Sequence, residues 1–93
     1  MTTLFYFKTI SDYWDPPEIT YYKVYIDDNC SKNSCKLAHF VDAQHRITVG
    51  HSNSLYTKTD IRNILKNKKV TIISEEEWKE NASKMLEIAK NLI

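Results

Sequence analysis

The segments LFYFKTI at residues 4–10 and ITYYKVYID at residues 19–27 decide the fold of this chain. Both are dense in aromatic and β-branched side chains, which favour β-strands. Between them, Pro16 and Pro17 remove two backbone donors and disfavour a helix, so residues 11–18 are predicted to form a loop. The chain is therefore expected to begin with two strands joined by a short connection.

A β-hairpin is predicted over residues 36–51, where two strand-like segments are separated by the polar sequence Asp-Ala-Gln-His. A two-residue turn at the centre of this sequence would pair Ala38 with Val49 and Phe40 with Ile47. That register collects the apolar side chains of both strands on one face.

The second half of the chain adds two helices and one more strand. Thr57 or Thr59 can cap a helix that runs to about residue 66. Residues 70–73 predict a short strand. Ser74 then opens a capping-box sequence with three glutamates, and apolar side chains follow at helical spacing to the end of the chain.

These elements give the order β-β-β-β-α-β-α and predict an α+β fold with an antiparallel or mixed sheet of about five strands. We expect both helices to cover one face of the sheet, which leaves the other face open. The length of 93 residues fits a single domain over residues 1–93. No apolar run approaches the ~20 residues that span a bilayer, and the first residues lack the features of a secretory signal. We therefore expect a cytoplasmic protein with no membrane partner.

Alternation along the first two strands predicts which side chains the open face presents. If Phe5 and Phe7 point into the core, Tyr6, Tyr21 and Tyr25 point outward. Tyrosine anchors many protein interfaces, so this face is a candidate protein-binding surface or a homodimer contact. The same tyrosines would also suit an ordinary sheet surface, because the ring can be half exposed with its hydroxyl in water.

The loop before the second strand is a further candidate for protein binding. Tyr13, Trp14 and Asp15 lie on a segment that two prolines stiffen, and a stiff aromatic loop loses little entropy when it binds. The alternative is that Trp14 packs back over the core and the prolines only shape the turn.

Charge is unevenly distributed along the chain, although the net charge is +1. Residues 30–69 hold eight Lys and Arg against two acids, whereas residues 1–29 hold two Lys against five acids. This basic middle permits an anionic partner. The alternative function is therefore a nucleic-acid-binding module, in which tyrosines stack on bases and cations meet phosphates. The candidate cations are Lys23, Arg46, Lys58, Arg62 and Lys66.

Cysteine and histidine cluster in the middle of the chain and raise a third alternative, a zinc-stabilised domain. The hairpin register places His51 opposite Lys36, beside Cys35, so Cys30, Cys35 and His51 are candidate ligands. The C-x₄-C spacing is at the edge of what zinc sites use, and no fourth ligand is evident. Free thiols are favoured over zinc or a disulfide in an intracellular chain, so no metal or cofactor is expected.

No enzyme chemistry is indicated. The single glycine, Gly50, excludes a glycine-rich phosphate loop, and a Cys35–His51 pair would lack an orienting group and an oxyanion site. The thin core of so short a chain suits a shallow binding face. We therefore expect a non-enzymatic protein that acts through contact with another protein, as an inhibitor or adaptor. Compact inhibitors that viruses and phages make against host systems are of this kind.

Overall fold

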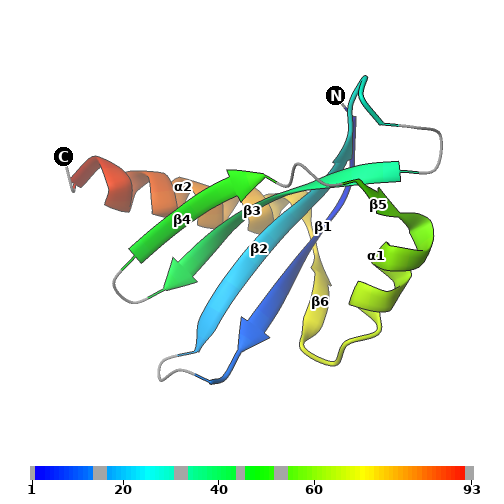
Figure 1. The fold of residues 1–93 in the computed structure, drawn as a ribbon. Helices are drawn as coiled ribbons and strands as arrows, with labels where there is room; N and C mark the ends of the chain where they lie inside the picture. The colour runs from blue at the N-terminus through cyan, green and yellow to red at the C-terminus, as the bar shows by residue number, and fades with distance from the viewer. Residues whose placement is uncertain (1, 14–16, 31–33, 44–45, 52–54, 92–93) are drawn as a thin grey trace.

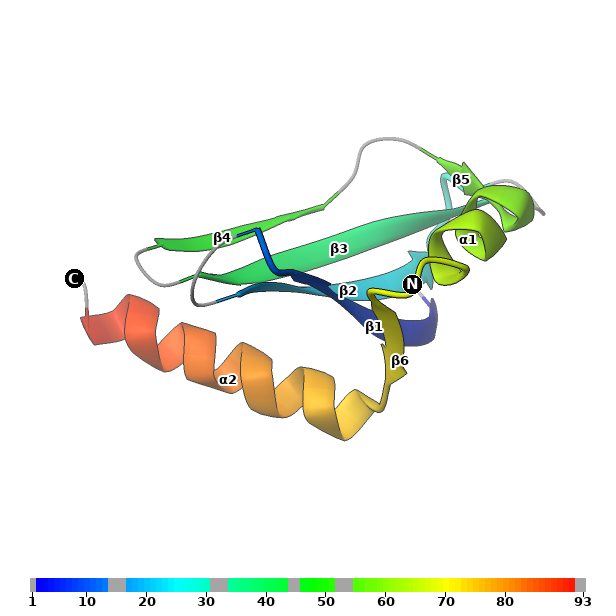
Figure 2. The ribbon, with the colours of Figure 1, turned by 90° about the horizontal axis from the view of Figure 1, so that it is seen from below.

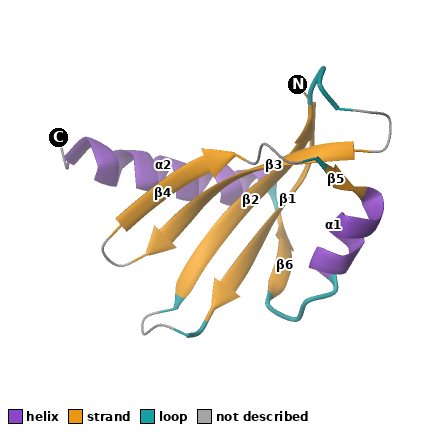
Figure 3. Cartoon of the chain, in the orientation of Figure 1, coloured by secondary structure: helices purple, strands orange, loops and turns teal. Residues whose placement is uncertain are grey.

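The computed structural model describes residues 2–13, 17–30, 34–43, 46–51 and 55–91. Within these ranges, a five-stranded antiparallel sheet packs against two helices (Figure 1 and Figure 3). The strands are β1 (Thr2–Ser11), β2 (Glu18–Ile26), β3 (Ser34–Ala43), β4 (Arg46–His51) and β6 (Val70–Ile73). The helices are α1 (Lys58–Leu65) and α2 (Glu75–Asn91), and the two-residue strand β5 (Tyr56–Thr57) precedes α1. The predicted α+β class and the order of the main elements are confirmed.

The strands lie in the order β4-β3-β2-β1-β6, so the chain returns after α1 to add β6 beside its first strand. Each pair of neighbouring strands is antiparallel. The sheet is therefore antiparallel, one of the two possibilities that the sequence allowed. The short β5 lies off this path and pairs with the start of β3. Among the described residues, no helix is both long and apolar enough to cross a membrane.

The two helices pack on opposite faces of the sheet, with a hydrophobic core on each side (Figure 2). One face, here called the α1 face, buries Phe7 and Val24 against Ile61 of α1. The other, the α2 face, buries Tyr21 and Phe40. The prediction that both helices cover one face is therefore wrong. Odd-numbered and even-numbered residues of β1 and β2 are both largely apolar or aromatic, so each face of the sheet has side chains to bury.

Both helices begin at the predicted caps. The hydroxyl of Thr57 accepts a hydrogen bond from the Asp60 amide, and the Asp60 carboxylate accepts one from the Thr57 amide, which completes a capping box. The hydroxyl of Ser74 accepts a hydrogen bond from the Glu77 amide at 3.1 Å. Lys8 of β1 then reaches across to the Glu77 carboxylate at 3.0 Å and ties the first turn of α2 to the sheet.

The hairpin of β3 and β4 is shifted by two residues from the predicted register. Ala38 pairs with His51 instead of the predicted Val49. Phe40 pairs with Val49 instead of the predicted Ile47. The last pair before the turn joins Ala43 and Arg46, so the connecting residues are 44–45, which lie outside the described residues. A shift of two keeps every residue on its predicted face, and for this reason alternation alone could not detect it.

Candidate functional site

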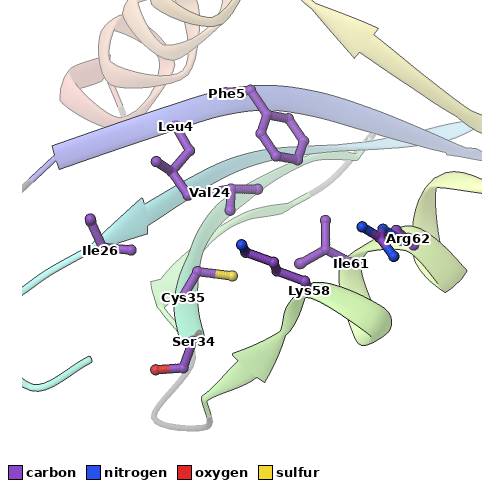
Figure 4. Close-up of a pocket in the computed structure, with 9 residues that line it drawn as sticks. All are labelled: Leu4, Phe5, Val24, Ile26, Ser34, Cys35, Lys58, Ile61 and Arg62. Atoms are coloured by element: carbon purple, nitrogen blue, oxygen red, sulfur yellow. The ribbon is translucent and has the colours of Figure 1, made fainter. Parts of the chain in front are cut away.

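A pocket of about 390 Å³ lies between the sheet and α1 (Figure 4). We call it the α1 pocket. Its volume falls within the range of small-ligand sites. Apolar groups dominate the lining, and both charged side chains in it come from α1. The lining residues are Leu4, Phe5, Val24, Ile26, Ser34, Cys35, Lys58, Ile61 and Arg62.

A bulge in β1 turns two successive side chains toward the α1 pocket. Thr3 pairs with Tyr25 and Phe5 pairs with Val24, so Leu4 has no partner of its own in β2. An extra residue in one strand of a pair bends that strand and redirects its side chains. Leu4 and Phe5 consequently both line the pocket. Leu4 lies at its edge and is 52% exposed to solvent.

Helix α1 places an apolar side chain between two cations. Lys58, Ile61 and Arg62 are three and four residues apart, so they share one side of the helix. Ile61 is buried against the sheet, and Figure 4 shows Lys58 and Arg62 on either side of it. Both basic side chains belong to exposed residues, so they form the rim of the pocket while Ile61 forms part of its wall.

Neither cation of the rim is neutralised in the part of the chain that the structure describes. The ion pairs among the described residues join other side chains, and the carboxylate of Asp60, on the same helix, accepts a hydrogen bond from the Thr57 amide. The α1 pocket therefore has an apolar floor and a positively charged rim. This arrangement suits a ligand in which an apolar group lies next to a negatively charged group.

The thiol at the base of the pocket is not activated as a nucleophile. Cys35 is buried, and its Sγ donates a hydrogen bond to the Tyr56 carbonyl oxygen at 3.5 Å. Burial raises the pKa of the Cys35 thiol, and the neighbouring Cys30 and Asp60 raise it further. A thiol with a raised pKa stays protonated at neutral pH, whereas a catalytic cysteine needs the thiolate.

The candidate zinc ligands are held by other partners. Cys30 and Cys35 are free thiols. In the turn after β2, Cys30 Sγ donates to Asp27 Oδ1 at 3.4 Å and accepts from the Asp27 amide at 3.5 Å. The observed register pairs His51 with Ala38, not with Lys36 beside Cys35 as predicted. Among the described residues, no three His, Cys, Asp or Glu side chains stand close enough to hold a metal.

Asp27 of this turn also pairs with Lys36 of β3, at 2.9 Å between Asp27 Oδ2 and Lys36 Nζ. The hydrogen bond from Lys36 lowers the pKa of Asp27, as do those from the Asn29 amide and the Cys30 thiol. The folded state therefore binds a proton at this carboxylate less readily than the unfolded state. The contribution of Asp27 to stability is present above the unfolded pKa and is lost as the pH falls through the folded pKa.

We expect Asp27→Asn to lower the urea midpoint at neutral pH and to have little effect well below about pH 4, where the wild-type carboxyl is also protonated. Urea titrations of both proteins at neutral and acid pH measure this difference. Asp28→Asn, at the exposed neighbouring position, is the matched control and should change the midpoint little at either pH. If Asp27→Asn lowered the urea midpoint by the same amount at both pH values, the ionised carboxylate of Asp27 would not be the source of the stability.

The predicted nucleic-acid residues do not form one surface. Lys58 and Arg62 line the α1 pocket, and Lys66 is the C-cap residue of the same helix. Lys23 pairs with Tyr6 and lies on the α2 face, on the other side of the sheet. Arg46 begins β4, where its backbone pairs with Ala43.

The predicted protein-binding tyrosines are mostly covered. Tyr21 and Tyr25 are buried, at 5% and 8% exposure, and Tyr6 packs against Trp78 with 5.3 Å between ring centroids. The α2 face is therefore not the open face that the sequence predicted. In the loop, Tyr13 is 84% exposed, whereas Trp14 and Asp15 lie outside the described residues.

The apolar half of the α1 pocket was not identified as a site from the sequence. Phe5 was predicted to point into the core, and Ile26, Ser34 and Ile61 were not considered as binding residues. The Leu4-Phe5 pair at the start of β1 was the available signal, because two adjacent large apolar residues in a strand cannot both face one core without a bulge.

No protein-family model, curated protein sequence or solved structure matches this chain. Its function is therefore inferred from the side chains that the fold brings together. Among these, the α1 pocket combines concave apolar surface with charge that lacks a partner in the described residues.

Proposed function

We propose that the protein is a non-enzymatic binding protein and that it recognises a partner protein through the α1 pocket. The observation that carries this proposal is the pairing of an apolar pocket with Lys58 and Arg62, whose charges have no ion-pair partner among the described residues. A partner segment with a large apolar side chain beside acidic residues matches both features. The apolar group would supply affinity in the pocket, and the acids would set orientation at the rim.

The sheet beside the pocket supports a macromolecular partner. Phe7, Tyr22 and His39 form a row across the α1 face, with ring centroids 4.7 Å and 5.8 Å apart. Tyr22 and His39 are only half-buried, since the eight-residue α1 covers one end of this face. Phe5 lines the pocket and contacts Phe7, so the pocket and the row are continuous. A partner chain can span both, whereas a small molecule would occupy the pocket alone.

The role that we propose is that of an inhibitor or adaptor that acts by occupying a partner's surface. The protonated thiol of Cys35 supports binding over catalysis, because the one buried nucleophile in the pocket is held in its unreactive form. We also propose a cytoplasmic location. The free thiols of Cys30 and Cys35 suit a reducing compartment.

The proposal is tested with a synthetic peptide that carries one phenylalanine between aspartates. When this peptide is titrated into the ¹⁵N-labelled protein, we expect the amide signals of pocket residues such as Leu4, Val24 and Ile61 to shift. The double variant Lys58→Glu, Arg62→Glu should bind about tenfold more weakly, because each exposed ion pair contributes on the order of 0.5–1 kcal/mol. Both residues are exposed, so the fold should survive the change.

Lys84→Glu is the matched control for charge, because Lys84 is exposed on α2 and outside the pocket. It should leave peptide affinity unchanged, and replacing the phenylalanine of the peptide by alanine should abolish the shifts. A peptide that binds the double variant as well as it binds wild type would overturn the proposal. A single-stranded oligonucleotide that shifts the same signals more strongly, with a steep loss on adding salt, would favour the nucleic-acid alternative.

A further inference from the structure

The two cations at the rim of the α1 pocket stand close enough to hold one carboxylate together. Lys58 and Arg62 are one turn apart on α1, and side chains at this spacing have their Cβ atoms about 5–6 Å apart. They lie on either side of Ile61, whose side chain forms part of the pocket wall (Figure 4). A carboxylate that contacts both cations therefore lies beside Ile61, at the mouth of the pocket. None of the described lining residues is acidic, so no carboxylate of the lining competes with it.

The pocket itself admits a single large residue of a partner. Its volume of about 390 Å³ is near the lower end of the range for ligand sites, and its floor is apolar. The inserted side chain must therefore be apolar, and the negative charge must stand at the rim, directly above it.

An acidic side chain next to the inserted residue does not meet this requirement. In an extended segment, successive side chains point to opposite sides. When an apolar side chain enters the pocket, the acids before and after it consequently point away from the pocket. The α-carboxylate of a chain's last residue differs, because it is bonded to the same Cα as the side chain. One terminal residue thus supplies both the apolar group and the negative charge.

We propose that the segment recognised by the α1 pocket is the C-terminus of a partner protein that ends in a large apolar residue such as phenylalanine. The terminal side chain occupies the pocket, and the terminal carboxylate is held between the Lys58 ammonium and the Arg62 guanidinium. Charge-assisted hydrogen bonds of this kind are strong, and a guanidinium can donate two in parallel to one carboxylate. The inference rests on the proposed function, because it specifies which kind of segment the same pocket binds.

The residues that precede the terminus would lie on the aromatic row of the α1 face. Phe5 joins the pocket to Phe7, and Tyr22 and His39 continue the row across the sheet. Tyr22 and His39 are half-buried, so part of each side chain is accessible. An apolar side chain two residues before the terminus points to the same side as the terminal one and can cover these rings. This second contact favours a protein terminus over a free small carboxylate.

The test uses short peptides that are titrated into the ¹⁵N-labelled protein and followed through its amide signals. Acetyl-Ser-Leu-Ser-Phe with a free carboxylate is expected to bind about tenfold more tightly than the same peptide ending in an amide, which carries no charge. A third peptide has one glycine added after the phenylalanine and again ends in a free carboxylate. It keeps the charge but moves it one residue further on, so it should bind as weakly as the amide. Acetyl-phenylalanine alone should bind more weakly than the full peptide, because it cannot reach the aromatic row.

Variants of α1 identify the groups that hold the carboxylate. In the double variant Lys58→Ala, Arg62→Ala, the peptides ending in a carboxylate and in an amide should bind equally, since both cations are gone. Lys66→Ala is the matched control, because Lys66 is one turn further along the helix and outside the pocket. It should leave the difference between the two peptides unchanged. All three positions are exposed, so the fold should survive each substitution.

The outcomes separate this inference from the proposed function. The acidic peptide with an internal phenylalanine could bind the pocket while the carboxylate and amide forms of the terminal peptide bind equally. The inference would then be overturned, and the proposed function would stand. If none of the peptides shifted the signals of the pocket, the proposed function would fail as well. If acetyl-phenylalanine bound as tightly as the full peptide, the ligand would be a small carboxylate and the assignment to a protein terminus would be wrong.

Discussion

Phe7→Ala is expected to lower the free energy of unfolding by about 3–5 kcal/mol, the range for truncating a fully buried phenylalanine. Phe7 is 1% exposed, and its ring stacks on Tyr22 at 4.7 Å between centroids. It lies in β1, which pairs with β2 on one side and β6 on the other. Removing the ring leaves a cavity between the sheet and α1 that the surrounding strands cannot close.

The loss is large compared with the whole stability of such a chain. At about 0.05–0.15 kcal/mol per residue, a domain of 93 residues has about 5–14 kcal/mol of unfolding free energy. Urea denaturation followed by circular dichroism measures the difference. Leu4→Ala, in the same strand but 52% exposed, is the control and should cost less than about 1 kcal/mol. Equal effects of the two substitutions would mean that the core is not centred on Phe7.

The elements of this fold could be predicted from local sequence because each has a local physical cause. The aromatic and β-branched segments form β1 and β2, and the hydroxyls of Thr57 and Ser74 cap the two helices where expected. Capping depends on residues within one turn of the helix, so no knowledge of the tertiary fold was needed. Strand β5 was missed, since its two residues carry no periodicity and it exists only by pairing with β3.

The placement of the helices could not be predicted, because the sequence of β2 suits burial on either side. Tyr21 and Tyr22 are adjacent and point to opposite faces, and Val24 and Tyr25 repeat the pattern. A tyrosine can be half exposed or buried with equal ease, so it does not report which face a helix will cover. The outcome depends on the path of the chain, which crosses the sheet edge through β6 between α1 and α2.

Only the charged part of the candidate site could be predicted from the sequence. Lys58 and Arg62 were identified because they belong to the basic middle of the sequence, and their four-residue spacing places them on one side of one helix. The apolar floor that gives these charges a role combines Phe5, Val24 and Cys35 from three strands. Such a combination depends on strand order and on the bulge at Leu4, and neither can be read from a single segment.

Trp78→Ala is expected to be the second most damaging substitution, with a loss of about 3 kcal/mol and detachment of α2 from the sheet. Trp78 packs its ring on Tyr6 and Phe40, at 5.3 Å and 4.8 Å between centroids. It therefore joins the helix to two strands that are not neighbours in the sheet. With the indole removed, Met85 would be the one buried side chain that α2 keeps against the sheet, among the residues whose burial is described.

Because the two cores lie on opposite faces, the damage should be confined largely to one side. Hydrogen exchange is expected to show faster exchange for the amides of α2, while those of β1 and β2 stay protected by Phe7 and Val24 on the α1 face. Leu86→Ala, at a 58% exposed position of the same helix, is the control and should leave exchange unchanged.

If instead every amide lost protection equally after Trp78→Ala, the two cores would have to unfold as one unit. The α1 pocket could not then keep its shape when α2 detaches, whereas separate cores predict that this variant still binds the acidic peptide through Lys58 and Arg62.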